Sequence, residues 1–184
     1  MLVLWIILGV VLFFALAAVG IYNQLVFLRQ TVKNSWSQID VQLKRRHDLI
    51  PNLIETAKGY MSHERETLER VVKARQQAVN ASSIKDKQQA ENFLTGTLRS
   101  LFAVVENYPN LKADLHMLKV QEELTTTENK IAFARQYYND EAARYNTAVQ
   151  TFPNSVIAGM GGFISLEYFQ IEDPADKVVP SVKF

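Results

Sequence analysis

The first 28 residues contain no Asp, Glu, Lys, Arg or His, and this uncharged stretch restricts the possible folds more than any other feature. A helix of about 20 apolar residues crosses a hydrocarbon core about 30 Å thick, and lipid offers its backbone no outside hydrogen-bond partner. Trp5 and Tyr22 lie near its two ends, where aromatic rings suit the membrane interfaces. The sequence therefore predicts a transmembrane anchor over residues 1–24, with membrane lipid as its partner.

Two alternatives remain open for this stretch. A cleaved secretory signal is one, because Ala15-Leu16-Ala17 resembles a small-residue cleavage site, although no basic residue precedes the apolar run. A buried core helix is the other, although the rest of the chain offers no second fully apolar helix to enclose it. We favour retention as an anchor over both.

The distribution of positive charge predicts the orientation of the anchor. Only the α-amino group precedes the span, whereas Lys and Arg residues follow it, which favours an outside N-terminus and a cytoplasmic domain at the inner or plasma membrane. We expect Lys44, Arg45 and Arg46 to lie at the solvated end of that domain and to pair with Asp48 or Glu55. The basic residues that follow the span are Arg29, Lys33, Lys44, Arg45 and Arg46.

The remaining chain shows apolar residues at helical spacing, which predicts an all-α fold over residues 25–152. The first soluble helix continues the span, with apolar residues at helical spacing from Val32 to Leu43. A second helix begins near Asp48, has Pro51 in its first turn and extends to about Val79. Short connections between long helices favour an antiparallel up-and-down bundle of three to four helices.

Two further helices complete the expected bundle. One carries apolar residues from Ala90 to Val105, and the other runs from about Pro109 to Phe152, with a break possible at Thr125-Thr126-Thr127 because β-branched residues weaken a helix. The expected inner stripe of this last helix comprises Leu111, Leu115, Leu118, Ile131, Arg135, Tyr138, Ala142, Tyr145, Val149 and Phe152.

Residues 153–184 differ in composition from the bundle, because their prolines and glycines interrupt any helical pattern. We expect an irregular tail whose Phe163, Tyr168 and Phe169 dock on the bundle.

Three segments, in this order and spacing, carry a family resemblance. They are RRHDLIPNLIETAKGY from Arg45, YPNLKA from Tyr108 and TENKIAFARQYYNDEAARYNTAVQTFPNSVIAGMGGF from Thr127. With the apolar N-terminal span, they make the chain resemble the LemA family of bacterial membrane proteins over nearly its whole length. The resemblance implies a single-pass protein with a small extracytoplasmic N-terminus and a cytoplasmic helical bundle. It supplies no catalytic residues.

Composition and motifs predict neither an enzyme nor a cofactor. The chain has no cysteine and a formal net charge of +1, which disfavours thiolate metal sites and nucleic-acid binding. His47, His63 and His116 form no short metal-binding spacing. No glycine is followed by lysine, as a phosphate-binding loop would require, and no serine lies in a G-x-S-x-G elbow.

A group of polar residues lies inside the stripe of the last long helix. Seven-residue spacings place Glu128 with Arg135, and Tyr138 with Tyr145, on about the same face. They predict either a buried polar network that fixes helix register or a face that docks a partner. The candidate residues are Glu128, Asn129, Arg135, Tyr138 and Tyr145.

Three functions are compatible with these features. We expect an interaction or scaffold module that assembles with itself or with a protein partner at the membrane face. A sensor that couples the span to the bundle is the alternative, and it requires an unbroken helix from Tyr22 to Trp36. An enzyme would need Glu64, Glu66 or Glu128 to lie in a concave pocket.

Overall fold

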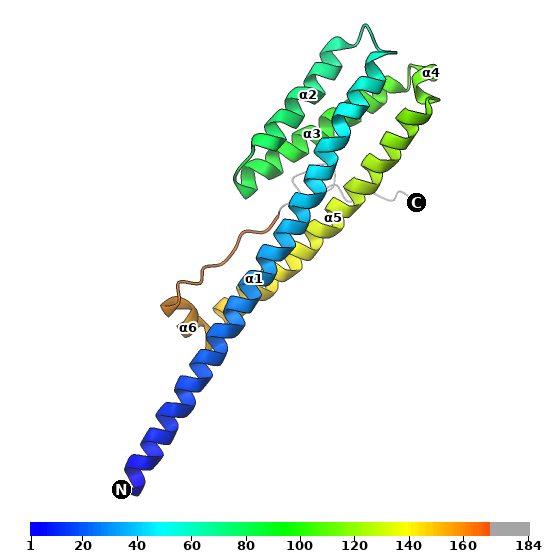
Figure 1. Cartoon of the computed structure of the whole chain (residues 1–184). Coiled ribbons are helices and arrows are strands. Elements are labelled where there is room, and N and C mark those ends of the chain that lie inside the picture. Colours follow the sequence, from blue (N-terminus) through cyan, green and yellow to red (C-terminus); the bar gives the residue numbers. More distant parts are fainter. Residues whose placement is uncertain (170–184) are drawn as a thin grey trace, which may run out of the picture. The chain divides into compact units, whose positions relative to one another are not determined.

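The computed structural model describes residues 1–169 and contains within them six helices and no strand (Figure 1). Its all-α architecture with an apolar N-terminal helix confirms the predicted fold class. Contacts divide the described chain into unit 1, residues 1–39 and 133–168, and unit 2, residues 40–132 and Phe169. The helices are α1 (Leu2–Lys58), α2 (Arg65–Asn80), α3 (Ile84–Val105), α4 (Pro109–Lys112), α5 (Leu115–Gln150) and α6 (Asn154–Met160).

Unit 2 contains the antiparallel bundle. The second part of α1, then α2, α3 and the first part of α5 run alternately up and down (Figure 1). Leu53, Val71, Leu94 and Leu101 from these helices are completely buried. Because burying one such side chain contributes about 1.5–3 kcal/mol, this apolar core provides the main stabilisation of the unit.

A seven-residue repeat of buried positions runs along α1 and α5. Such a repeat is typical of helices that pack as coiled coils, where each side chain enters a hole between four residues of the facing helix. The repeat also accounts for the buried Tyr138 and Tyr145 of the predicted stripe. Its members are Leu25, Val32, Ile39, Arg46 and Leu53 in α1, and Met117, Leu124, Ile131, Tyr138 and Tyr145 in α5.

The prediction of a new helix near Asp48 is wrong, because α1 continues through Pro51 to Lys58. Proline cannot donate to the carbonyl four residues earlier, which normally interrupts a helix. In this chain that carbonyl belongs to His47, and it accepts a 2.7 Å hydrogen bond from Nε of Arg75. A side chain from α2 thus satisfies the group that Pro51 leaves unpaired.

We expect Arg75→Met to lower the free energy of unfolding by about 1–3 kcal/mol, since the His47 carbonyl loses this partner in a half-buried place. Urea unfolding followed by helix circular dichroism in mild detergent measures the change. Arg70→Met on the same helix removes only an exposed pair with Glu66 and should cost less than about 1 kcal/mol. Equal losses in the two variants would contradict this role of Arg75.

The helix predicted to extend to Val79 is interrupted at residues 59–64, between α1 and α2. The amide of Met61 donates to the carbonyl of Ala57, which closes the end of α1. Lysine in the last turn followed by glycine is a common helix ending, so Lys58 and Gly59 carried a signal that the apolar spacing masked. Helix α3 ends at Val105 as predicted, and it begins at Ile84, ahead of its first predicted apolar residue, Ala90.

The last long helix also differs from its prediction. It is divided at Ala113 and Asp114 into α4 and α5, whereas the threonines at 125–127 cause no break. Leu115, Leu118 and Phe152 are 80%, 47% and 79% exposed, so they lie outside the inner stripe. The hydroxyl of buried Thr127 donates to the carbonyl of Glu123 at 2.7 Å, which accommodates its polar group within the helix.

Asp114 begins α5, because its carboxylate accepts hydrogen bonds from the amides of His116 and Met117 at 2.9 and 3.0 Å. The bond from the Met117 amide is the main reason that the pKa of Asp114 lies below its usual 3.8, with a further contribution from the Tyr60 hydroxyl. A carboxylate whose pKa is lowered in the folded state stabilises the fold above its unfolded pKa.

We therefore expect the melting temperature of the chain to exceed that of Asp114→Asn near pH 6. The difference should disappear as the pH falls through the lowered pKa of Asp114, because both side chains are then neutral. Thermal melts followed by circular dichroism between pH 6 and pH 2 measure it. Asp86→Asn, at the start of α3, serves as a comparison for a second capping region. A difference that stays constant with pH would contradict the assignment.

Unit 1 joins the first part of α1 to the end of α5, α6 and residues 161–168. Trp36 packs edge-on against Tyr138, with ring centroids 5.3 Å apart. Residues 154–160, predicted to be irregular, form α6 instead. Phe163 is 6% exposed, whereas Tyr168 is 45% exposed. Residues 170–184 of the predicted tail lie outside the described part of the chain.

Candidate functional site

A buried ionic cluster lies within the bundle of unit 2. Nη1 of Arg46 lies 3.3 Å from a carboxylate oxygen of Glu91 and 3.0 Å from one of Glu128. Nη2 of Arg46 donates to the hydroxyl of Thr95 at 2.8 Å. Nε2 of His47 lies 2.6 Å from the other oxygen of Glu91. Helices α1, α3 and α5 are thereby linked through charged side chains.

The cluster is secluded from water at its centre. The side chains of Arg46 and Glu91 are 4% and 1% exposed, whereas that of Glu128 is 41% exposed. Taking two charges out of water costs several kcal/mol, and only good geometry with further hydrogen bonds offsets that cost. Because both Glu91 oxygens and both terminal Arg46 nitrogens have partners, the cluster provides that geometry.

The prediction that Arg46 lies at a solvated end and pairs with Asp48 or Glu55 is wrong. Arg46 lies between Ile39 and Leu53 in the buried seven-residue repeat of α1. Glu91 likewise lies three residues before buried Leu94 on the inner face of α3. Charged residues at apolar positions were the available signal, since a residue buried at such a position needs an opposite charge.

A small hollow of about 210 Å³ opens beside the ionic cluster. Its lining includes Arg46 and Glu128 from the cluster, together with Arg99 and Asn129. Water or a small polar group could reach the exposed face of Glu128 here. The hollow is too small for a drug-sized ligand, since such sites usually measure about 300–1,000 Å³.

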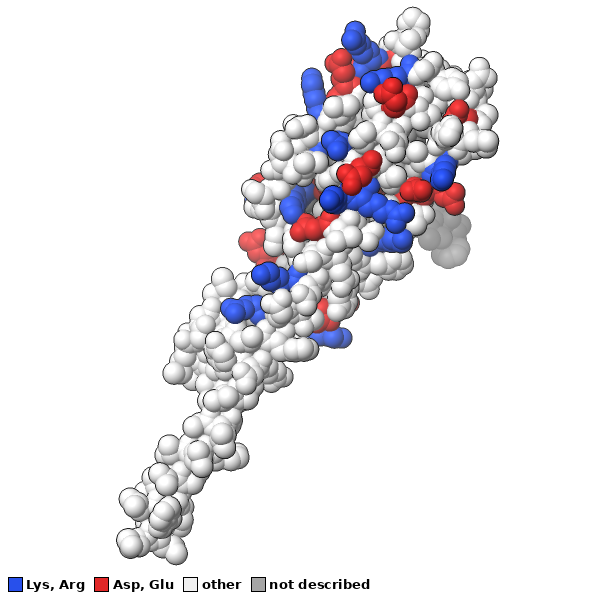
Figure 2. All heavy atoms as spheres, viewed as in Figure 1, with Lys and Arg blue, Asp and Glu red and all other residues white. Residues whose placement is uncertain are grey.

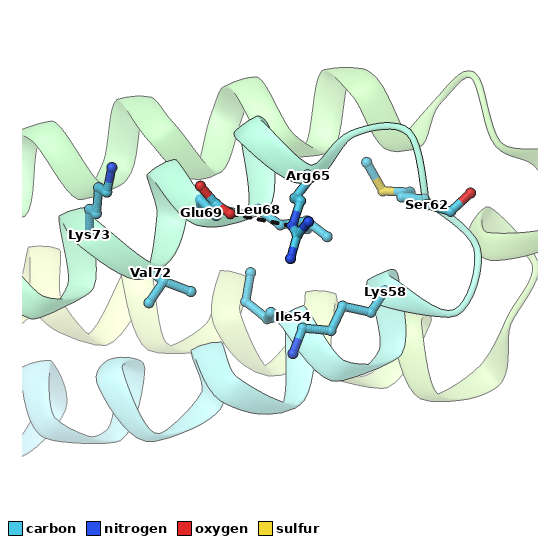
Figure 3. Close-up of a pocket in the computed structure, with 9 residues that line it drawn as sticks. Ile54, Lys58, Ser62, Arg65, Leu68, Glu69, Val72 and Lys73 are labelled. Carbon is cyan, nitrogen blue, oxygen red and sulfur yellow. Dashed lines mark ion pairs between the residues drawn. The ribbon is translucent and has the colours of Figure 1, made fainter.

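A larger hollow of about 580 Å³ lies between α1 and α2. Figure 3 shows Ile54 and Val72 pointing into it, with Lys58 at its rim and Arg65 paired with Glu69. An apolar floor with a polar rim is typical of surfaces that bind another protein. Its lining residues are Ile54, Lys58, Met61, Ser62, Arg65, Leu68, Glu69, Val72 and Lys73.

The structure divides the predicted polar residues between the two units. Glu128 and Asn129 belong to unit 2, where Glu128 joins the ionic cluster and Asn129 is exposed. Arg135, Tyr138 and Tyr145 belong to unit 1. The five residues therefore lie in different surroundings.

Tyr138 and Tyr145 are both buried within unit 1. Tyr138 is 2% exposed and its hydroxyl donates to the carbonyl of Glu167 at 2.8 Å. Burial, helped by the charge of Glu167, raises the pKa of Tyr138. Burial also raises the pKa of Tyr145, which is 1% exposed, while the charge of Arg29 opposes that rise. Neither ring offers a surface that a partner could reach.

The glutamates considered for catalysis are dispersed. Glu64 accepts a 3.4 Å hydrogen bond from the hydroxyl of Tyr108, whose pKa is raised mainly by burial. Glu66 pairs with Arg70 on the surface, and Glu128 pairs with Arg46. Across residues 1–169, no three His, Asp or Glu side chains are grouped so that they could hold a metal ion.

The beginning of α1 presents apolar side chains on all sides. Every large apolar residue from Met1 to Phe14 is at least 49% exposed. Figure 2 shows this N-terminal part of unit 1 without a charged residue. The exposure is the opposite of what a buried core helix shows, and the helix is long and apolar enough to cross a membrane.

A match to a family model shows to which protein family the chain belongs. The model of the LemA family matches residues 35–184, which include both the ionic cluster and the hollow between α1 and α2. The chain belongs to the LemA family. The prediction made from the three sequence segments is thus confirmed, and this LemA-family chain is a membrane-associated helical protein.

The individual relatives that match the chain share only a modest part of its sequence. "Protein LemA" of Metamycoplasma hominis is 27% identical over 160 residues, which cover 84% of this chain and 71% of the relative. "Magnetosome protein MamQ" of Magnetospirillum gryphiswaldense is 27% identical over 180 residues, which cover 84% of this chain and 66% of the relative. A similar match is "Magnetosome protein MamQ 2" of Paramagnetospirillum magneticum. The LemA-family chain thus spans about two thirds of the length of the magnetosome relatives.

Proposed function

We propose that this LemA-family protein is a membrane-anchored interaction module. Residues 1–24 span the bilayer, and the helical bundle assembles at the membrane face with further copies or with a protein partner. The exposed apolar beginning of α1 carries the proposal, because it would be covered by lipid in a membrane and has no other cover within the described chain. Anchoring restricts the bundle to a plane and so raises its effective concentration for assembly.

The hollow between α1 and α2 is the surface that we assign to assembly. Lys58, Arg65 and Lys73 surround its apolar floor, and Glu69 is the acidic residue in the lining. This balance suits a partner segment that offers an apolar side chain flanked by carboxylates. Val72 is 47% exposed there, so it is available for such a contact.

The test compares two valines on α2 in the full chain, purified from membranes in mild detergent. Val72→Asp should abolish complexes seen by native mass measurement, because it places a carboxylate on the apolar floor of the hollow. Val79→Asp is the matched control, since Val79 is 50% exposed on the same helix and does not line the hollow. A chain that is monomeric and without companions before any substitution would overturn the proposal.

The proposed orientation places the N-terminus outside and the bundle in the cytoplasm, because basic residues follow the span. The chain has no cysteine, so a single Val79→Cys substitution gives one labelling site in the bundle. A membrane-impermeant maleimide should label it in lysed cells and not in intact cells. Labelling in intact cells would reverse the orientation.

Helix continuity favours the sensor as a second candidate. The helix α1 is unbroken from Leu2 to Lys58, which includes the Tyr22 to Trp36 stretch that mechanical coupling requires. A sensor predicts that amide exchange at Glu91 changes when the chain is moved between bilayers of different thickness. A purely static anchor predicts the same exchange in every bilayer.

A further inference from the structure

We propose that α6 and its flanking residues form a second membrane contact, lying in the headgroup region of the same bilayer that the N-terminal helix crosses. This inference rests on the proposed anchor, and it adds a lipid-binding surface at the opposite end of the sequence. All the residues that carry it belong to unit 1.

The first observation is an exposed apolar surface. Val156 and Met160 are four residues apart on α6, which places them on one face, and they are 54% and 83% exposed. Phe152 before the helix and Ile164 after it are 79% and 74% exposed. Large apolar side chains exposed this closely along one short segment are unusual unless something covers them.

The second observation is the absence of charge around this surface. The chain carries no Asp, Glu, Lys or Arg between Arg144 and Glu167. In Figure 2, which has the same view as Figure 1, the surface at α6 contains no charged residue. An uncharged segment with large apolar residues can enter the interface between headgroups and acyl chains without placing a charge in lipid.

The third observation places the segment at the end of the span. The ring of Phe163 packs edge-on against Tyr22, with centroids 5.5 Å apart. The guanidinium carbon of Arg29 lies 5.0 Å from the centre of the same ring. Phe163 therefore joins residues just after α6 to the point where α1 becomes charged.

Distances along α1 give the depth of this contact. Tyr22 and Arg29 are seven residues apart, which is about 10 Å along a helix axis. The headgroup region is about 5–8 Å thick on each side of the bilayer, from the difference between total and hydrocarbon thickness. With Tyr22 at the hydrocarbon boundary, Arg29 lies at the outer edge of the headgroups, and Phe163 between them holds α6 at interfacial depth.

Two glycines allow the chain to make this connection. A Cβ on Gly161 would lie 2.6 Å from a ring atom of Phe163, so the ring could not keep its place against a larger residue. Gly162 has a φ of 66°, in the left-handed region that favours glycine. The turn after α6 thus directs Phe163 back to α1 while Met160 faces outward.

The test uses fluorescent labels on single cysteines in the full chain, which has no cysteine of its own. Met160→Cys, Leu12→Cys and Val79→Cys are each labelled with an NBD dye and reconstituted into vesicles of phosphatidylcholine and phosphatidylglycerol. Lipids that carry a doxyl quencher, one set near the headgroup to reach position 160 and one set deep in the acyl chain to reach position 12, are then added to the mixture. We expect loss of emission and a blue-shifted spectrum at positions 12 and 160, and neither change at position 79.

The controls separate the outcomes. A label at 160 that stays red-shifted and unquenched while the label at 12 is quenched overturns the second contact and leaves the anchor intact. A blue-shifted label at 160 that lipid quenchers do not reach indicates cover by a second copy of the chain, which also overturns the inference. Quenching at 79 would show that the lipid contact is not specific for α6. No quenching at 12 would overturn both the anchor and the second contact.

Discussion

Replacing Glu91 by glutamine is expected to lower the free energy of unfolding by about 3 kcal/mol or more. Glutamine has nearly the same shape, so no cavity forms. It removes the negative charge that faces the guanidinium of Arg46 at 3.3 Å and His47 at 2.6 Å. The charge of Arg46 would then be shared only with the half-exposed Glu128. Urea unfolding of the full chain in mild detergent measures the loss.

Two comparisons identify the cause of that loss. Glu66→Gln breaks an exposed pair with Arg70 and should change stability by less than about 1 kcal/mol. The double variant Arg46→Met with Glu91→Leu should lose less than Glu91→Gln alone, because it leaves no unpaired buried cation. If the double variant is the less stable of the two, the ion pairs and hydrogen bonds of the cluster themselves stabilise the bundle, beyond the avoidance of an unpaired charge.

Replacing Asn146 by leucine is expected to release residues 163–168 from α5. The amide of Asn146 accepts from the backbone N–H of Leu166 at 2.8 Å and donates to its carbonyl at 2.9 Å, as a neighbouring strand would. Losing both bonds should cost about 2 kcal/mol, since each contributes about 0.5–1.5 kcal/mol. Amide exchange at Leu166 should accelerate by about tenfold or more, because each 1.4 kcal/mol is a factor of ten.

Hydrogen exchange read by mass spectrometry provides the measurement, with Gln150→Leu as the control. Gln150 reaches the same segment through a longer 3.3 Å bond to Ser165 on the surface, so its loss should matter much less. Exchange in α3 should stay unchanged in both variants, since α3 belongs to unit 2. Unchanged exchange at Leu166 in Asn146→Leu would show that other contacts, such as the packing of Phe163 and the Tyr138 hydrogen bond to Glu167, hold the segment.

The sequence predicted those parts of the fold that depend on local pattern. The apolar run of α1, the spacing from Ala90 to Val105 and the seven-residue repeat at Tyr138 and Tyr145 each reflect a helix burying one face or meeting lipid. These features need no knowledge of distant residues. The fold class and the family followed from them and from the three matching segments.

The errors arose where distant residues decide the local structure. Pro51 remains inside a helix because Arg75, from α2, serves the carbonyl that proline leaves free. Arg46 is buried because Glu91 and Glu128 approach it from two other helices. Neither partner can be read from spacing along α1. The division of α4 from α5 was in principle readable, since Asp114 is a common helix-starting residue.

Arg46 also restricts how α1 can move within unit 2. It occupies one position in a repeat whose neighbours, Ile39 and Leu53, are apolar. If α1 slid by one heptad, apolar contacts would be exchanged for similar ones, but the guanidinium would leave both carboxylates and enter an uncharged layer. Translation of α1 along its axis is therefore costly, whereas tilting or bending that keeps the ion pairs is not. Any mechanical response in this bundle would therefore be a change of helix angle.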